Sequence, residues 1–241
     1  MPVLLGYWKV RGLAQPIRYI LEYAGIEYEE KLYEQGPAPD YSRDDWLKEK
    51  HDFGLTFPNL PYLFDGDVKL TETNVIIRYL SSKANLLGTN DDERIRADLA
   101  NEIAKDIRTM IGYNAYNPKW EELKPELLKY ADEMFKSLSE FLSENKWFAG
   151  QNLTYADFVM FELFDQFLKV DPGLLDKYKN LQEFKNRFDA IPAIAAYRKT
   201  DKFTSFPIYN KRAPLSTSYM APLCLSFHFL EYFGSPGDPT K

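Results

Sequence analysis

The sequence predicts an α/β domain built on a mixed sheet, followed by an all-helical domain. Up to about Ala84, short apolar segments at strand spacing alternate with segments at helical spacing. From about Asp91 onward only the helical periodicity remains. Alternation of strands and helices is typical of a layered α/β unit. We therefore expect a first domain at residues 1–84, a linker at 85–90 and a helical domain at 91–213.

The first domain is expected to follow the order βαβα-ββα. Asp65-Gly66-Asp67 stands between two short apolar runs, which is a strong hairpin signal. The predicted elements are strand Val3–Leu5, helix Gln15–Ala24, strand Glu27–Tyr33, helix Arg43–Lys50, strands Tyr62–Phe64 and Val68–Leu70, and helix Thr73–Ser82.

The second domain is expected to contain five helices. Pro118, Pro172-Gly173 and Pro192 separate the helical segments. Thr154 and Asp157 form a capping-box pattern ahead of an apolar helix, which we interpret as structural. The predicted helices are Asp92–Asn114, Lys124–Glu144, Tyr155–Lys169, Leu181–Ala190 and Ala193–Lys199.

Composition and charge exclude several classes of protein. The net charge of −6 argues against a nucleic-acid-binding protein, which needs a basic face. Cys224 is the single cysteine, so an intrachain disulfide or a Cys-based zinc site is excluded, and two histidines make a histidine-rich metal site improbable. No segment has the length of a membrane span, and the first residues lack the apolar core of a signal peptide. We expect a cytoplasmic protein with no metal.

Tyr7 is the most informative single residue. It follows the strand Val3–Leu5 and precedes a turn at Gly12 and a helix that begins near Pro16. Backbone N–H groups and the helix dipole favour an anion at such a place, and a phenol there can donate a hydrogen bond to it. The alternative is a structural tyrosine in the core.

Arg43, Trp46 and Lys50 recur at helical spacing. Two cations and an indole N–H on one face suit a small carboxylate. A solvated basic face is the other reading of the same spacing.

Two further positions carry local signals for ligand binding. A cis bond between Leu60 and Pro61, just before a strand, would expose the backbone of Leu60 to an extended ligand, although cis X–Pro bonds are uncommon. Thr73 is a natural N-cap that leaves helix N–H groups for an anion, unless it is only a structural cap.

Together these segments resemble the mu class of cytosolic glutathione transferases over about residues 1–213. The segment around Gly36–Ser42 resembles a loop that distinguishes this class. The matching motifs are Gly6-Tyr-Trp-Lys-Val-Arg-Gly-Leu-Ala-Gln-Pro16, Ala38-Pro-Asp-Tyr-Ser-Arg-Asp-Asp-Trp-Leu-Lys-Glu-Lys50, Phe57-Pro-Asn-Leu-Pro-Tyr62, Asp91-Asp-Glu-Arg-Ile-Arg-Ala-Asp98 and Trp147-Phe-Ala-Gly150.

The resemblance implies a thioredoxin-like first domain, a helical second domain and a homodimer that conjugates glutathione to hydrophobic electrophiles without a cofactor. Tyr7 would hydrogen-bond the glutathione sulfur, and Phe57 would insert into the partner subunit. Asp106 would face the γ-glutamyl ammonium group of glutathione in the partner. The implied glutathione-binding residues are Tyr7, Trp8, Leu13, Arg43, Trp46, Lys50, Asn59, Leu60, cis-Pro61, Glu72, Thr73 and Asp106.

The resemblance also implies a pocket for the electrophile, in which Tyr116 would project over the substrate. Glu72-Thr73 stands where the class usually has Gln-Ser, and Lys105, Thr109 and Gly112 stand where bulkier apolar residues are common. These departures leave the substrate preference open. The implied pocket residues are Val10, Lys105, Thr109, Gly112, Tyr116 and Tyr209.

Other functions are compatible with the same fold. A non-catalytic carrier of hydrophobic anions is one alternative, and a structural protein that reuses the fold is another. A thiol–disulfide oxidoreductase is disfavoured because no cysteine lies at the start of the first helix. Residues 214–241 match nothing in the class. We expect the tail from Leu215 to be dispensable for glutathione binding, even if its apolar residues cover the electrophile pocket. Those residues are Phe227, Phe229, Leu230, Tyr232 and Phe233.

Overall fold

A four-stranded mixed sheet forms the centre of the first domain in the computed structural model, which describes residues 2–204 and 206–215. The strand order is β2-β1-β3-β4; β1 and β2 are parallel, and the other neighbours are antiparallel. The two-residue turn Gly66–Asp67 joins β3 to β4, as predicted. The strands are β1 (Val3–Trp8), β2 (Tyr28–Tyr33), β3 (Tyr62–Asp65) and β4 (Val68–Thr71).

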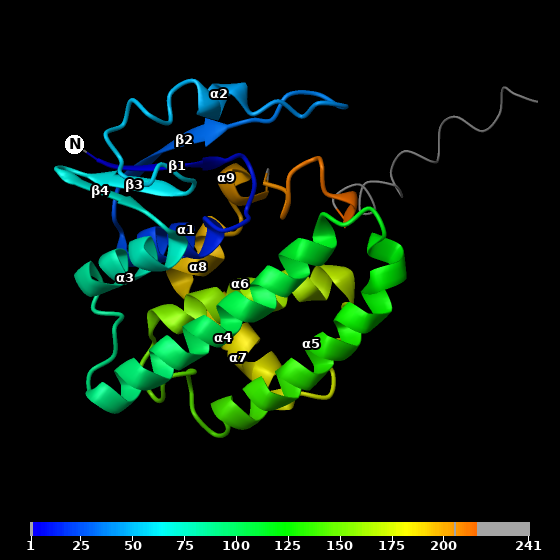
Figure 1. Ribbon diagram of the computed structural model, residues 1–241. Helices are drawn as coiled ribbons and strands as arrows, with labels where there is room; N and C mark the ends of the chain where they lie inside the picture. Colours follow the sequence, from blue (N-terminus) through cyan, green and yellow to red (C-terminus); the bar gives the residue numbers. More distant parts are fainter. Residues whose placement is uncertain (1, 205, 216–241) are drawn as a thin grey trace, which may run out of the picture.

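Helices cover the sheet unequally. The helices α1 (Gln15–Ala24) and α3 (Thr73–Lys83) pack against each other between the sheet and the helical domain, whereas the short α2 (Asp44–Leu47) lies on the opposite side (Figure 1). The side chains of α1 from Gln15 to Leu21 are all buried. The first turn of α1 therefore lies at the junction between the two domains.

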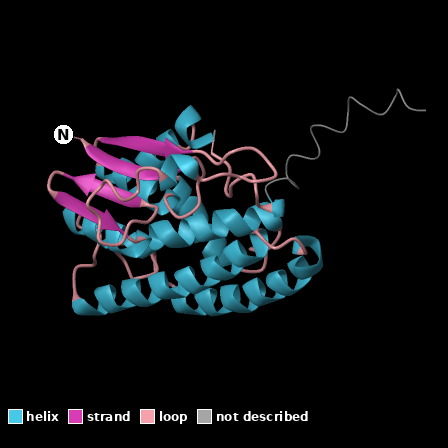
Figure 2. Cartoon of the chain, turned by 45° about the horizontal axis from the view of Figure 1, so that its top comes forward, coloured by secondary structure: helices cyan, strands magenta, loops and turns pink. Residues whose placement is uncertain are grey.

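The second domain consists of helices in its described part (Figure 2). Nearly every residue of α6 is buried, and this helix packs against α1 and α3 of the first domain and against α4 and α7. The helices are α4 (Asp91–Ala115), α5 (Trp120–Leu142), α6 (Tyr155–Val170), α7 (Lys179–Asp189), α8 (Pro192–Tyr197) and α9 (Asp201–Thr204).

A buried ionic network joins the domains next to the loop between β1 and α1. Arg11 is 4% exposed and contacts Glu162 and Asp165 of α6 through Nη2, each at 2.6 Å. The backbone N–H groups of Arg11 and Gly12 donate to the carbonyl oxygens of residues 207 and 208. The loop that follows Tyr7 is therefore held by α6 and by the C-terminal segment together.

The fold class agrees with the prediction, and several boundaries need correction. The helix predicted at Arg43–Lys50 is reduced to α2, so Lys50 lies in the turns after it rather than on its face. The helix α5 begins at Trp120, with Pro125 inside it, and α9 was not predicted. The predicted capping box of Thr154 and Asp157 is confirmed.

The predicted N-cap at Thr73 is wrong. Glu72 is the N-cap of α3, with a left-handed φ of 70°, and its carbonyl accepts the N–H of Ile76 at 3.0 Å. Thr73 is the first helical residue and is buried. The change of backbone direction at Glu72, rather than a side-chain cap, sets the start of this helix.

The part of the chain that the structure describes holds neither a candidate metal centre nor a candidate membrane span. Among residues 2–204 and 206–215, no group of three or more His, Cys, Asp and Glu side chains is placed to hold a metal ion. None of the helices in this part of the chain combines the length and apolar character needed to cross a membrane.

Candidate active site

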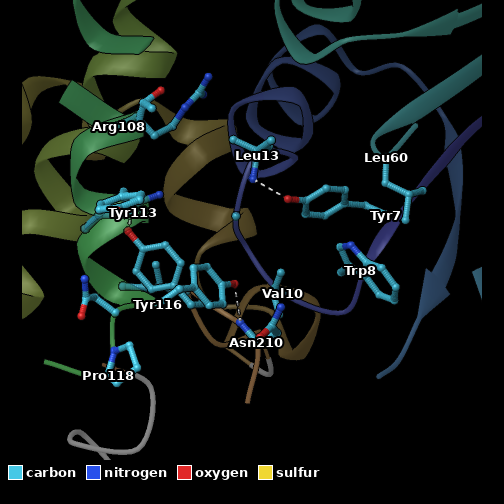
Figure 3. A pocket seen from close by; sticks show the side chains of 17 residues that line it. Tyr7, Trp8, Val10, Leu13, Leu60, Arg108, Tyr113, Tyr116, Pro118 and Asn210 are labelled. Carbon is cyan, nitrogen blue, oxygen red and sulfur yellow. Dashed lines mark hydrogen bonds between the residues drawn. The ribbon is translucent and has the colours of Figure 1, made fainter. Parts of the chain in front are cut away.

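Tyr7 lies at the end of β1 with its hydroxyl beside the start of α1. The residue is 6% exposed, and its register partner on β2 is Leu32. The backbone N–H of Leu13 donates a hydrogen bond of 3.0 Å to the Tyr7 hydroxyl oxygen (Figure 3). No described residue accepts the Tyr7 hydroxyl proton, and burial raises the pKa of this phenol to about 12. Tyr7 thus stays protonated at neutral pH and can donate a hydrogen bond to a ligand.

Two glycines make room for this arrangement. Gly12 has a left-handed φ of +42°, and a Cβ atom there would lie 2.7 Å from the Tyr7 hydroxyl oxygen. A Cβ atom on Gly6 would lie 2.0 Å from the ring of Tyr62 on the neighbouring strand. The glycines noted on either side of Tyr7 in the sequence are therefore required by close approach of neighbouring groups.

The Tyr7 hydroxyl opens into a cavity of about 770 Å³ between the domains. One wall is the loop between β1 and α1, another is α4, and the third is the segment 208–210. This volume lies within the usual range for small-molecule sites. The lining residues are Tyr7, Trp8, Val10, Gly12, Leu13, Leu60, Arg108, Thr109, Gly112, Tyr113, Tyr116, Asn117, Pro118, Gln166, Ile208, Tyr209 and Asn210.

Tyr116 lies across the cavity from Tyr7 (Figure 3), and Tyr209 lines the same cavity. Their ring centroids are 5.8 Å apart in an edge-to-face arrangement. The Tyr209 hydroxyl donates to Gln166 at 3.1 Å, whereas the Tyr116 hydroxyl accepts the N–H of Asn210 at 3.4 Å. Tyr116 is 40% exposed, and partial burial raises the pKa of its hydroxyl. Tyr116 therefore offers a second phenol proton to a molecule in the cavity.

Comparison with known proteins identifies the family. The N-terminal domain model of glutathione S-transferases matches residues 3–82, and the C-terminal domain model matches residues 102–201. Glutathione S-transferase Mu 1 of Rattus norvegicus is 48% identical over 90% of this chain and 99% of its own length. The chain belongs to the glutathione S-transferase family. Mu 1 of Mus musculus, 46% identical over 88% of this chain and 98% of its own length, supports the same assignment.

Solved structures of glutathione S-transferases share the fold. The structure of glutathione S-transferase Blo t 8 is 33% identical, with a TM-score of 0.80 over 87% of this chain and 98% of that one. A Pi-class glutathione S-transferase of Onchocerca volvulus is 26% identical, with a TM-score of 0.78 over 88% of this chain and all of that one. The predicted family, fold and enzyme class are thereby confirmed.

The predicted carboxylate-binding residues of this transferase lie at the α2 edge of the first domain. Arg43 is exposed, and Lys50 is half-buried. Trp46 is 7% exposed, because its ring stacks on Phe53 and Tyr62 at centroid distances of 6.1 Å. Trp46 therefore has a clear packing role, and the two cations remain on the surface beside it.

The predicted backbone-binding residues lie between the sheet and α3. The bond between Leu60 and Pro61 is cis, as the family resemblance implied. Asn59 links this turn to α3, since its Nδ2 donates to Glu72 at 3.2 Å and its Oδ1 accepts the N–H of Leu60 at 2.9 Å. Glu72 and Thr73 line a second cavity of about 440 Å³.

The predicted electrophile-pocket residues divide between the two cavities. Val10, Gly112, Tyr116 and Tyr209 line the first cavity. Lys105 does not line it: this residue faces the second cavity, beside Glu72 and Thr73, and pairs with Glu102 at 3.0 Å. The side chain of residue 105 is one turn of helix away from the first cavity. Thr109 lines both cavities.

Two predicted residues for dimer contacts lie outside both cavities. Asp106 is exposed on α4, and Phe57 is 75% exposed in the loop before β3. A single chain leaves both side chains available to a second molecule.

Sequence reasoning missed Arg108, which lines both cavities. Helical spacing could have found it, because Arg108 follows Lys105 by three residues and precedes Gly112 by four. The cavity also includes Gln166 and Asn210, which no local sequence pattern marks.

Proposed function

We propose that this family member conjugates glutathione, through its thiolate, to small hydrophobic electrophiles. The observation that carries the proposal is the Tyr7 hydroxyl, whose oxygen accepts a hydrogen bond from the N–H of Leu13 in a cavity that both residues line. The proposal is further supported by the mu-class names of relatives that match almost the whole chain.

The proposed chemistry depends on the protonation state of sulfur. A free thiol has a pKa of about 8.5 and is only a few per cent ionised at pH 7. A hydrogen bond donated by Tyr7 favours the thiolate, and each pKa unit corresponds to about 1.4 kcal/mol. The N–H of Leu13 lowers the pKa of the Tyr7 hydroxyl against the larger effect of burial, which makes the phenol a better donor. The thiolate sulfur then forms a bond to the electrophile. The electron pair of the bond that breaks goes to the leaving group, or to the oxygen of a strained ring that opens.

We assign the glutathione backbone to the surface from α2 to α3. In this assignment Arg43 and Lys50 hold the glycine carboxylate, and the backbone of Leu60 pairs with the middle of the tripeptide. Glu72 and Thr73 take the γ-glutamyl end at the second cavity. The other residues assigned to this surface are Trp8, Leu13, Trp46, Asn59 and Pro61.

The first cavity is assigned to the electrophile. Tyr116 would donate to an oxygen that gains negative charge, while Val10 and Tyr209 contribute apolar surface. Gly112 leaves open space on the α4 wall, because nothing lies within 4 Å of the position a Cβ atom would take. A bulky electrophile can therefore lie against α4.

The proposal extends to assembly and location. Phe57 and the exposed apolar residues Val75, Ile95 and Leu99 favour a homodimer, in which Asp106 would face the partner's γ-glutamyl site. We propose a glutathione-binding domain at 1–84 and an electrophile-binding domain at 91–213, joined by 85–90. The single cysteine favours a cytoplasmic location, and the proposed reaction needs no cofactor.

A turnover assay tests the function. Purified protein is mixed with glutathione and an aryl halide, and product absorbance is followed beside a Tyr7→Phe variant. Turnover by the parent chain that falls strongly in the variant supports the proposal. Glutathione binding without turnover on any member of an electrophile panel would instead indicate a carrier of hydrophobic anions.

A further inference from the structure

Arg108 carries a positive charge that the described part of the protein does not neutralise. Its Nη1 atom is buried and has no hydrogen-bond partner, and the residue forms no ion pair within residues 2–204 and 206–215. Burial lowers the pKa of Arg108, but a guanidinium stays charged in proteins. The residue as a whole is half-buried, and an unpaired charge that is partly withdrawn from water is costly unless a ligand completes it.

The neighbouring cations are neutralised. Arg11 is paired with Glu162 and Asp165 at 2.6 Å, and Lys105 is paired with Glu102 at 3.0 Å. Arg18 is paired with Glu30 at 3.0 Å through its Nη2. Arg108 thus differs from these three cations, because no carboxylate of the described residues forms an ion pair with it.

The groups that face Arg108 from the surrounding elements do not supply a free anion. They are Tyr7 on β1, Glu162 on α6, Tyr209 in the C-terminal segment and Glu102 on α4 itself. Glu162 is held by Arg11, and Glu102 is held by Lys105. The two phenols are neutral at pH 7, because burial raises the pKa of both.

Arg108 and the Tyr7 hydroxyl share one cavity. Arg108 lines the first cavity together with Tyr7 and Leu13, the two residues joined by the 3.0 Å hydrogen bond. Figure 3 shows Arg108 on α4, across the gap from Leu13. Its charge lowers the pKa of the Tyr7 hydroxyl, against the dominant effect of burial. An anion that accepts a hydrogen bond from the Tyr7 hydroxyl would experience the electric field of the same Arg108 charge.

We propose that Arg108 supplies the positive charge that, together with the Tyr7 hydroxyl, stabilises the glutathione thiolate in this site. This inference rests on the proposed function. The thiolate is the anion that this reaction forms beside Tyr7, and a fixed charge in the cavity stabilises it without reorganisation. A carboxylate of glutathione and an anionic group on the electrophile are the competing occupants, and the experiment separates them.

The test measures the thiol pKa of bound glutathione by the ultraviolet absorbance of the thiolate across a pH range. It uses the parent chain with Arg108→Gln, Arg108→Met and Arg108→Lys. Arg94→Gln is the matched control, because Arg94 lies on the same helix, is exposed and pairs with Asp91 at 2.9 Å. Melting temperatures show which variants are folded. Arg108→Met provides a second neutral replacement if Arg108→Gln does not fold.

We expect the neutral variants to raise the thiol pKa by about one unit, which lowers the thiolate fraction and kcat/KM about tenfold at pH values below that pKa. Arg108→Lys should restore most of the shift, and Arg94→Gln should leave it unchanged. An unchanged thiol pKa in a folded neutral variant overturns the proposal. With that pKa unchanged, weaker glutathione binding would assign Arg108 to a glutathione carboxylate, and a loss restricted to carboxylate-bearing electrophiles would assign it to the second substrate.

Failure of the proposed function would look different. In that case the parent chain itself would form no thiolate absorbance with glutathione at any pH below the free thiol pKa. The Arg108 comparison is therefore read only against a parent chain that shows the signal, and absence of the signal overturns both proposals together.

Discussion

The backbone N–H of Leu13 points at the hydroxyl oxygen of Tyr7, 3.0 Å away, so the phenol accepts one hydrogen bond from its own loop. Because the donor belongs to the backbone, only a proline at position 13 would remove it. The oxygen position is fixed, and the hydroxyl proton is directed away from the N–H. This relation turns a buried tyrosine into an oriented donor.

Tyr7→Phe should lower kcat/KM by about 10²–10³-fold while leaving glutathione affinity within a few-fold. The hydroxyl would touch only the sulfur, whereas affinity comes mainly from the two carboxylate ends of glutathione. The loss should be largest well below pH 8.5, the approximate pKa of a free thiol, and should shrink above it. Rates measured across pH, with calorimetry for binding, check this. Equal turnover of parent and variant at low pH would exclude the role.

Gly12→Ala should reduce activity far more than Gly25→Ala. Both glycines have a left-handed φ, so both substitutions cost about 1 kcal/mol of backbone strain. Only the Cβ atom at position 12 meets the Tyr7 hydroxyl, at 2.7 Å, whereas nothing lies within 4 Å of a Cβ atom at position 25. Thermal unfolding and turnover of the two variants are compared. Similar activities at similar stabilities would contradict the proposed contact.

Local signals predicted much of the fold. The helix Gln15–Ala24 was placed correctly because Pro16 marks its first turn and apolar residues follow at helical spacing, and Asp65-Gly66-Asp67 marked the hairpin. The left-handed backbone at Glu72 was not predictable, because no glycine or asparagine signals it. Thr73 was therefore mistaken for the cap.

The candidate site was predictable only in part. The position of Tyr7 and the cis bond before Pro61 followed from motifs and the family resemblance. The contact of Arg11 with Glu162 joins residues 151 positions apart, and no local pattern reveals such a pair. The unpaired state of Arg108 likewise depends on which carboxylates the fold places beside its neighbours.

Phe57→Ala should weaken both self-association and glutathione affinity. Phe57 is 75% exposed, which is costly for a phenylalanine unless a partner covers it. Truncation of a buried aromatic anchor costs about 2 kcal/mol or more of association free energy. Sedimentation at several concentrations measures association, and calorimetry measures binding. A parent chain that sediments as an active monomer would refute the homodimer.

Asp165→Asn should reduce stability at neutral pH and flatten its dependence on pH in acid. Burial opposes the charge, but Arg11 and Arg198 lower the pKa of Asp165 to about 2. A carboxyl group with a lowered folded pKa contributes stability above its unfolded pKa of about 3.9 and loses it as pH falls towards 2. This contribution is about 2 kcal/mol at pH 7.

Urea unfolding of the parent chain and of Asp165→Asn between pH 2 and pH 7 measures the contribution of the Asp165 carboxylate to the free energy of unfolding. The difference in unfolding free energy between the two chains should narrow as the pH falls from about 4 towards 2. A difference that stays constant over that interval would show that Asp165 titrates at its ordinary pKa. Turnover at pH 7 is recorded as well, because the same network holds the loop after Tyr7.

A chain ending at Leu215 should bind glutathione as well as the full chain does. All residues proposed to act on glutathione, Arg108 included, precede residue 109, and residues 216–241, which include the aromatic residues considered as a cover for the pocket, lie outside the described residues. Ala213 and Leu215 are buried in the core, so the packed structure continues two residues past the predicted edge at 213. A shorter chain ending at Arg212 loses both residues, and burial of one leucine contributes about 1.5–3 kcal/mol. We therefore expect the 212-residue chain to be less stable than the full chain.

The 215-residue chain should keep its glutathione affinity, while its KM for bulky electrophiles should change. Calorimetric titration and thermal unfolding of the three chains check this, and loss of glutathione affinity in the 215-residue chain would place part of the binding site beyond Leu215.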